Sequence, residues 1–468
     1  MRSCRLFASL TFLLTIGTSP LLAVNNLPQS LDKILAAPAL KGGITGAIVC
    51  RVEDGKVLYE HNADLRLLPA SNRKLFTSAA ALELLGDNFH ISTDLCAAVK
   101  PDAAGNVQGD LYLRGGGDGL LSQADLEMMA QTLAKAGVKD VTGDLVGDPT
   151  RFTDGPYGFG WEWDDFSDEE FPQIAGLEVN EGVLNVHVAP GAAAGDPVSA
   201  TLQPATDYLP VEVKATTVAK DSVKDCYVSR PWEKNEFLVT GALPLGTTLD
   251  VKVPVDAPSL LAVTLLRDAM ANQGITIHGH LRVGVTPPEA VVLTSHVSLP
   301  LSQYLAKMNK PSDNLLAESL VRLLDSHGTY DAGHLQETPF FKSLGVNVNA
   351  IALVDGCGVG RRNFVTARSV SQLLIGMHHK ADWRIYYDSL PIMGVDGTLK
   401  NRLVGRAAAG NVHAKTGTLS QVRALSGYFT GKGGALYIFS LLMNNFPGTA
   451  HEAGDVQDRF VEDLVESL

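Results

Sequence analysis

Positive charge is scarce in this chain, and apolar runs are short beyond its first two dozen residues. The 468 residues include 38 lysines and arginines against 51 aspartates and glutamates, which gives a formal net charge of −13. An acidic surface disfavours nucleic acid or anionic lipid as the main partner. Because a membrane-spanning helix needs roughly 20 consecutive apolar residues, no membrane span is expected after the N-terminal segment.

Cysteine is also scarce, with five residues in the whole chain. Such few and widely spaced thiols are not the disulfide framework of a small secreted protein, so their pairing stays open beside the alternative of buried free thiols. Metal motifs are lacking too, because the His-Gly-His segment at 278–280 and the pair His378-His379 belong to no H-E-x-x-H pattern. We therefore expect neither a metal nor another cofactor.

Residues 1–23 have the composition of a secretory signal peptide. Arg2 and Arg5 precede an apolar run over residues 6–22, which leads into a polar segment. This order predicts cleavage after Ala23 and export of the mature protein to the periplasm. The alternative is an uncleaved membrane anchor, but threonine, glycine, serine and proline interrupt the run.

The two ends of the chain carry matching pieces of one domain. Near the N-terminus, a hairpin pattern with an Asp-Gly turn precedes a buried helix that carries Ser71 in its first turn and stops at Gly86. Near the C-terminus, three strand patterns precede an amphipathic helix. The expected elements are a hairpin over 44–52 and 56–61, strands over 411–418, 424–430 and 435–444, and a helix over 456–468. Strands from both termini imply an α/β (α+β) domain in which helices flank an antiparallel sheet.

A long insertion separates these ends, and two of its segments share a weakly similar pattern, a sequence echo. Helical patterns at 124–136 and 260–272 each lead through glycine into a strand pattern. We interpret the two units as halves of one inserted domain with a strand-rich module between them, and chance similarity is the alternative. The expected boundaries are 24–90 plus 296–468 for the catalytic domain, 91–180 plus 256–295 for the second domain and 181–255 for the third.

Three short motifs occur in a fixed order along the chain. Ser71 and Lys74 form S-x-x-K, residues 312–314 read S-D-N, and residues 415–417 read K-T-G. Alone, each motif has an ordinary interpretation, as a helix cap, a turn and a hairpin end respectively. Together and in this order, they are the motif set of β-lactamases and penicillin-binding proteins.

The spacing explains how these residue types act together. A separation of three residues places Ser71 and Lys74 on one helical face, where the lysine can take the hydroxyl proton if burial and nearby charge lower its pKa. Lys415 is expected to supply that charge. The helix N-terminus beside Ser71 suits an oxyanion, and Gly417 is expected to leave room for a substrate alongside the K-T-G strand.

Longer segments around the motifs resemble one protein family, the serine D-alanyl-D-alanine carboxypeptidase/endopeptidases of the class C low-molecular-mass penicillin-binding proteins (serine peptidase family S13). The similar segments are 69–77, 143–148, 160–165, 312–318, 394–399 and 415–419. The resemblance implies a penicillin-binding/β-lactamase-like transpeptidase domain with a nested, strand-rich two-domain insertion. It disfavours a β-lactamase, because the first two motifs of β-lactamases lie much closer together.

The resemblance also implies a role for each motif residue. Ser71 is the expected nucleophile, Lys74 the general base, and Ser312 the relay that passes a proton to the departing D-alanine. The expected substrate-binding residues are Asn314 for the substrate amide, Lys415, Thr416 and Thr418 for the terminal carboxylate, and the backbone N–H groups of Ser71 and Thr418 for the oxyanion. A β-lactam is expected to acylate the same serine and to leave slowly.

One similar segment departs from the family pattern. Residues 355–361 resemble a D-G-S-G-L-S-R stretch, but Cys357 and Gly360 stand at its two serine positions, which puts local loop hydrogen bonds in doubt rather than catalysis. The resemblance further implies that groups in the insertion and near this loop bind the amine and carboxylate of diaminopimelate. Asp148 and Arg361 are the candidates, with a turn residue and a surface arginine as the alternatives.

The predicted function is hydrolysis of peptidoglycan stem peptides and cross-links through an acyl-enzyme, with β-lactams as covalent inhibitors. A β-lactamase or esterase that uses the same Ser-Lys pair is the enzymatic alternative. A catalytically silent cell-wall-binding protein is an alternative of a different class, and the intact motifs argue against it.

Overall fold

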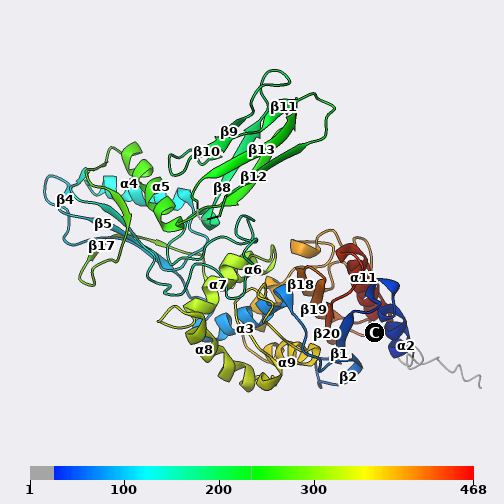
Figure 1. Cartoon of the computed structure of the whole chain (residues 1–468). Coiled ribbons are helices and arrows are strands. Elements are labelled where there is room, and N and C mark those ends of the chain that lie inside the picture. The colour runs from blue at the N-terminus through cyan, green and yellow to red at the C-terminus, as the bar shows by residue number, and fades with distance from the viewer. Residues whose placement is uncertain (1–25, 233) are drawn as a thin grey trace, which may run out of the picture.

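The computed structural model describes residues 26–232 and 234–468. The expected signal peptide at 1–23 lies outside these residues. One body contains both ends of the described chain, and a second, strand-rich body is formed by the middle of the chain (Figure 1). Within the described ranges, no helix combines the length and apolar character needed to cross a membrane.

A five-stranded antiparallel sheet joins the two ends of the chain. Its strands are β1 (Ile44–Arg51), β2 (Val57–His61), β18 (His413–Leu419), β19 (Val422–Thr430) and β20 (Leu436–Asn444). The strand order is β18-β19-β20-β1-β2, so β1 pairs directly with β20. The prediction that one sheet is built from both termini is confirmed by this pairing, which Figure 1 shows as blue and red-brown strands side by side.

Helices cover both faces of this sheet. They are α2 (Leu27–Leu35), α3 (Arg73–Leu85), α6 (Leu301–Asn309), α7 (Asn314–Leu323), α8 (Tyr330–Ser343), α9 (Ala367–His378), α10 (Trp383–Ser389) and α11 (Ala450–Ser467), with the 3-10 turns η1 (Pro38–Leu40), η2 (Ala70–Asn72), η4 (Val348–Ala350) and η5 (Gly397–Leu399). α3 ends at Gly86, whose φ of 87° favours glycine. α11 begins with a capping box between Thr449 and Glu452.

Alternation along β1 divides the core of this body into two layers. Ala47 and Val49 face one side and pack in a cluster with residues of α2 and α11. Ile48 and Cys50 face the other side, in a cluster with residues of α3 and α9. Because successive side chains of a strand point to opposite faces, the sheet is buried between two helical layers.

The second body contains the two helix-Gly-strand units. Its elements are β3 (Ser92–Ala97), β4 (Asn106–Val107), β5 (Leu111–Arg114), α4 (Gln123–Lys135), β6 (Asp140–Val141), β7 (Leu145–Asp148), α5 (Pro258–Asn272), β15 (Thr276–Ile277), β16 (Leu281–Val283) and β17 (Val291–Val297). The strands that follow α4 pair in parallel with those that follow α5, as β6 with β15 and β7 with β16. The two units therefore lie side by side through their strands, and their interpretation as halves of one inserted domain remains a prediction.

A group of further strands lies between these two units in the sequence. It comprises η3 (Asn180–Gly182), β8 (Val183–Ala189), β9 (Ser199–Gln203), β10 (Val211–Val213), β11 (Thr216–Val218), β12 (Asp225–Ser229), β13 (Phe237–Pro244) and β14 (Leu249–Pro254). The strands form one sheet of order β14-β8-β9 and another around β13. Their buried residues share one hydrophobic cluster with α4 and α5. The boundary between the second and third domains therefore remains a prediction.

Candidate active site

The site is centred on Ser71, in the turn η2 that leads into α3. The Nζ atom of Lys74, one turn further on, lies 3.1 Å from the Ser71 Oγ atom. Lys74 is fully buried, and burial lowers its pKa against the opposing effect of nearby acidic groups. A lysine in this position is suited to remove the hydroxyl proton, because a lowered pKa raises its neutral fraction near neutral pH.

Lys74 also connects Ser71 to the second motif. Its Nζ donates to the Asn314 Oδ1 atom at 2.7 Å and to the main-chain oxygen of Cys357 at 3.4 Å. Asn314 begins α7, and Asp313 caps that helix by accepting the N–H of Leu316 at 2.9 Å. The helix cap therefore fixes the position of the asparagine that contacts Lys74.

Ser312 contacts the third motif rather than Lys74. The Lys415 Nζ atom donates to the Ser312 Oγ atom at 2.8 Å and to the Thr416 carbonyl at 3.1 Å. Lys415 is fully buried, and its pKa is lowered well below the usual range by burial and then by the charge of Lys74. Two buried lysines thus each hold one serine hydroxyl of the site.

Two further contacts join the Ser71 turn to β18. The Asn72 side chain donates to the main-chain oxygen of Lys415 at 2.9 Å. A Cβ atom at Gly417 would lie 2.7 Å from the Pro69 carbonyl and 3.1 Å from the Ala70 side chain. The glycine of K-T-G is therefore required for the close approach of β18 to the serine-bearing turn, a packing reason that the sequence argument about substrate room did not include.

Five of the predicted site residues line one cavity of about 180 Å³: Ser71, Ser312, Asn314, Thr416 and Thr418. Lys74 and Lys415 lie behind this wall and contact it through Ser71 and Ser312.

Threonine hydroxyls on β18 face neighbours that the motif analysis did not assign. The Thr416 hydroxyl lies 2.8 Å from that of Thr398 in η5. The Thr418 hydroxyl accepts from the Arg423 Nη1 atom at 2.5 Å. Thr398 falls inside the similar segment 394–399, which is the signal that could have found it. Arg423 belongs to no motif and faces Thr418 only because β18 and β19 pair in this register.

Asn314 has a second partner from the insertion. Its Nδ2 atom donates to the main-chain oxygen of Glu170 at 3.0 Å, while its Oδ1 atom accepts from Lys74. Phe171 beside Glu170 also lines the cavity. The loop between β7 and η3 therefore occupies the asparagine amide that was predicted to bind the substrate.

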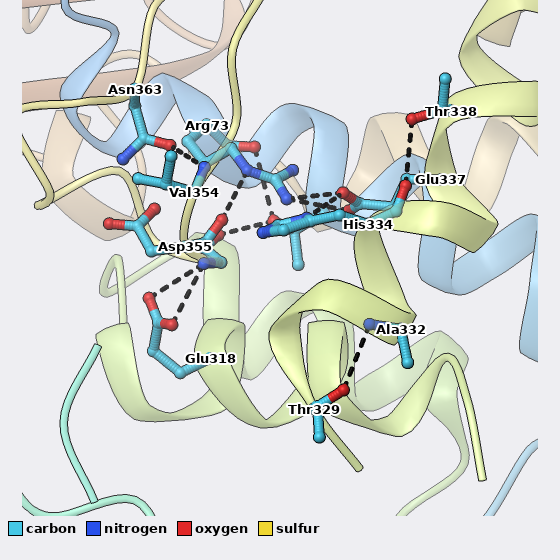
Figure 2. A network of polar contacts seen from close by, with 12 residues as sticks. Arg73, Glu318, Thr329, Ala332, His334, Glu337, Thr338, Val354, Asp355 and Asn363 are labelled. Atoms are coloured by element: carbon cyan, nitrogen blue, oxygen red, sulfur yellow. Dashed lines mark hydrogen bonds and ion pairs between the residues drawn. The ribbon is translucent and has the colours of Figure 1, made fainter. Parts of the chain in front are cut away.

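Figure 2 shows the buried ion pair between Arg73, two residues after Ser71, and Glu337. The Arg73 Nη2 atom contacts the Glu337 carboxylate at 2.8 and 2.9 Å, and its Nε atom donates to the Asp355 carbonyl at 2.8 Å. The Glu337 carboxylate also contacts the His334 Nδ1 atom at 2.9 Å. Although burial opposes ionisation, the charge of Arg73 lowers the pKa of Glu337. α8 and the loop after Asp355 are thereby connected to the residue between Ser71 and Lys74.

Two buried carboxylates hold the loop in which Cys357 and Gly360 stand in place of the expected serines. Figure 2 shows Glu318 and Asp355 near Arg73. Glu318 accepts the N–H groups of Gly356 and Cys357 at 3.1 and 2.8 Å. Asp355 accepts those of Gly358 and Gly360 at 2.8 and 2.7 Å, and burial and then the charge of Glu318 raise its pKa. These bonds position the Cys357 carbonyl against Lys74 without a serine side chain.

The two diaminopimelate candidates differ in their placement. Asp148 is buried on β7, where its carboxylate accepts from the backbone N–H and hydroxyl of Thr150 at 2.9 and 2.6 Å and from the N–H of Thr286 at 2.7 Å. Asp148 does not line the Ser71 cavity. Arg361 is partly exposed and contacts Glu162 at 3.2 Å and the Ser420 carbonyl at 3.4 Å, next to the end of β18. The structure therefore brings Arg361, but not Asp148, to the rim of the site.

Comparisons with known proteins agree with this geometry. The family model of the D-Ala-D-Ala carboxypeptidase 3 (S13) family matches residues 27–464. A D-alanyl-D-alanine carboxypeptidase of Actinomadura sp. (strain R39) is 39% identical, over 96% of this chain and 88% of the relative. The D-alanyl-D-alanine carboxypeptidase DacB of Haemophilus influenzae is 28% identical, over 96% of this chain and 93% of the relative.

A solved structure gives the same result for the fold. The crystal structure of penicillin binding protein 4 from Haemophilus influenzae matches 95% of this chain and 98% of that protein with a TM-score of 0.83, at 25% identity. The match of fold, motif order and nearly complete sequence places the chain in a single family. The protein belongs to the D-Ala-D-Ala carboxypeptidase 3 (S13) family.

Proposed function

We propose that this protein is a serine-type D-Ala-D-Ala carboxypeptidase that also acts as a DD-endopeptidase on peptidoglycan cross-links. The observation that carries the proposal is the 3.1 Å contact between a buried Lys74 Nζ and the Ser71 Oγ. A serine hydroxyl is a poor nucleophile until a base takes its proton, and Lys74 is placed to be that base.

Acylation begins when neutral Lys74 takes the Ser71 proton and the Oγ atom attacks the carbonyl of the penultimate D-alanine. The backbone N–H groups of Ser71 and Thr418 stabilise the oxyanion. Ser312, held by Lys415 at 2.8 Å, relays the proton from Lys74 to the amine as the C–N bond breaks, which returns Lys74 to its neutral form. Water then attacks the ester, so the acyl group leaves as a free acid and Ser71 is restored.

Substrate binding uses the cationic end of the cavity. Lys415 with Thr416 and Thr418 binds the terminal carboxylate: the two threonines line the cavity, and the negative charge of a bound carboxylate favours the protonated form of the buried Lys415 behind Ser312. Asn314 binds the substrate amide once the Glu170 carbonyl has given up its hydrogen bond. A β-lactam acylates the same serine and remains bound as a slowly hydrolysed ester.

The third residue of the stem peptide binds at the rim of the site. Arg361 is the candidate for a diaminopimelate carboxylate, in exchange for its contact with Glu162. Asp148 would have to give up its bonds to Thr150 and Thr286 in order to bind an amine, so it is the weaker candidate.

We further propose that the protein is exported and acts in the periplasm. The signal-peptide pattern of residues 1–23 supports export, and peptidoglycan lies outside the cytoplasmic membrane.

The test uses protein that lacks residues 1–23 beside a Ser71→Ala variant. Each is incubated with fluorescent penicillin and with a muropeptide that ends in D-Ala-D-Ala. A stable label and D-alanine release, both lost in the variant, are the expected results. Rapid turnover of penicillin would indicate a β-lactamase, and the absence of both label and release would indicate a wall-binding protein.

A further inference from the structure

A second cavity opens beyond the carboxylate-binding end of the site. Its volume is about 640 Å³, against about 180 Å³ for the cavity at Ser71. The two cavities share Thr398, Thr416 and Thr418 as a common wall. The outer cavity is therefore a continuation of the catalytic cleft, and its size falls within the range of ordinary ligand sites.

The inner wall of this outer cavity carries a cation without an acidic partner. Arg423 donates to the Thr418 hydroxyl at 2.5 Å and to the Ala450 carbonyl at 2.9 Å. Among the described residues, no carboxylate lies within ion-pair distance of it, whereas Arg402 on the same cavity pairs with Asp458 at 2.7 Å. Burial and the charge of Arg402 lower the pKa of Arg423. A bound carboxylate would supply the missing negative charge.

The outer wall is formed by the first turns of α11, which packs against β19. His451 and Asp455 on these turns are exposed and lie 3.3 Å apart. The cavity thus has a cationic inner end at Arg423 and mixed charge toward solvent, which complements a residue with a carboxylate at one end and amide or amine groups further out.

The shared wall also indicates on which side of the scissile bond the outer cavity lies. If Thr416 and Thr418 bind the carboxylate of the leaving residue, space beyond them lies on the leaving-group side of the scissile bond. A departing D-alanine has only a methyl side chain and does not fill this space. A cross-link has a much larger leaving group, a diamino acid whose long side chain continues into a second stem peptide.

We infer that the outer cavity between β18, residues 398–403 and α11 binds the leaving strand of a cross-linked peptide, with Arg423 facing a carboxylate of that strand other than the one bound at Thr416 and Thr418. This inference rests on the proposed DD-peptidase function. In the reaction, the amide between the D-alanine carbonyl and the leaving amine breaks, the acyl group passes to Ser71 Oγ, and the amine gains a proton. The cavity contributes binding of the leaving strand and takes no part in these bond changes.

Gly454 in α11 allows a steric test. It lines the outer cavity, and a Cβ atom there would meet only the Arg423 Nη2 atom, at 3.9 Å. Gly454→Phe should fill the cavity without disturbing the backbone. The matched control is Gly433→Phe, in the turn between β19 and β20, where a Cβ atom would have no neighbour within 4 Å.

The measurement compares kcat/KM for a D-Ala-D-Ala pentapeptide with kcat/KM for a cross-linked muropeptide dimer. For Gly454→Phe we expect dimer cleavage to fall by about tenfold or more while D-alanine release changes less than about twofold. Gly433→Phe should leave both reactions unchanged. Penicillin labelling and the melting temperature of each variant establish that the fold and Ser71 are intact.

The possible failures are distinguishable. Equal loss of both activities in Gly454→Phe, unchanged dimer cleavage, or a wild-type protein that releases D-alanine but leaves the dimer intact would each overturn the inference. A wild-type protein with neither D-alanine release nor penicillin label would instead overturn the proposed function.

Discussion

The Lys74 Nζ atom lies 3.1 Å from the Ser71 hydroxyl oxygen, at a depth where the lysine side chain has no contact with solvent. Burial disfavours the charged form of a lysine. The same side chain donates to Asn314 at 2.7 Å, which fixes its direction. Proximity, lowered pKa and a fixed orientation therefore meet in one residue.

Lys74→Met should slow acylation strongly while preserving the fold. The methionine has a similar length but cannot accept the Ser71 proton, and loss of a general base typically costs 10²–10⁴-fold in rate, so we expect penicillin labelling to slow by about 10³-fold. Stopped-flow labelling measures the rate. Lys56→Met, at an exposed lysine, is the control and should label normally. Normal labelling of Lys74→Met would mean that another group activates Ser71.

The acylation rate should rise with pH through the titration of Lys74. Only the neutral amine can accept a proton, and burial lowers the pKa of Lys74. The midpoint should therefore lie below the ordinary lysine value of about 10.4. Penicillin labelling rates at a series of pH values test this. A midpoint at or above the ordinary value, or a rate that falls as this group loses its proton, would contradict the role of Lys74 as base.

The sequence predicted the motif residues of the site better than the tertiary contacts that hold them in place. Ser71 and Lys74 are three residues apart on one helix, so their contact follows from local geometry alone. The contact between Lys415 and Ser312 was not predicted, because only tertiary packing brings β18 to the turn before α7. Arg423 and Glu170 belong to no motif. The pairing register of β18 and β19 places Arg423 in the site, and a loop of the insertion places the Glu170 carbonyl there.

Glu337→Ala should destabilise the protein strongly. It would leave Arg73 buried without its ion-pair partner, and such losses cost about 3–5 kcal/mol. The control is Glu83→Ala, which removes an exposed ion pair with Lys380 and should cost under about 1 kcal/mol. Urea unfolding measures both variants. Equal free energies of unfolding for the two variants would show that the buried ion pair stabilises the protein no more than the exposed one.

Acid should weaken the same ion pair. The pKa of Glu337 is lowered in the folded protein, so its contribution is complete above the unfolded value of about 4.3 and is lost as pH falls through the folded value. Below about pH 4, the free energy of unfolding should decline less in Glu337→Gln than in the wild type. An identical acid limb in both proteins would contradict this assignment.

The thiols should be unreactive until the protein unfolds. Cys50, Cys96, Cys226 and Cys357 are buried free thiols, and burial raises the pKa of each. Protein without residues 1–23 should show almost no reaction with Ellman's reagent when native and four thiols in denaturant. Fewer than four thiols after unfolding without reductant would reveal a disulfide, and rapid native reaction would contradict their burial.

The most direct test of the central claim is to locate the acyl group. Protein treated with penicillin is digested, and the peptides are compared by mass with those of the untreated protein. We predict that the peptide containing Ser71 gains the mass of one intact penicillin, and that Ser71→Ala gains none. A penicillin adduct on another residue, or an adduct that persists in Ser71→Ala, would contradict the account.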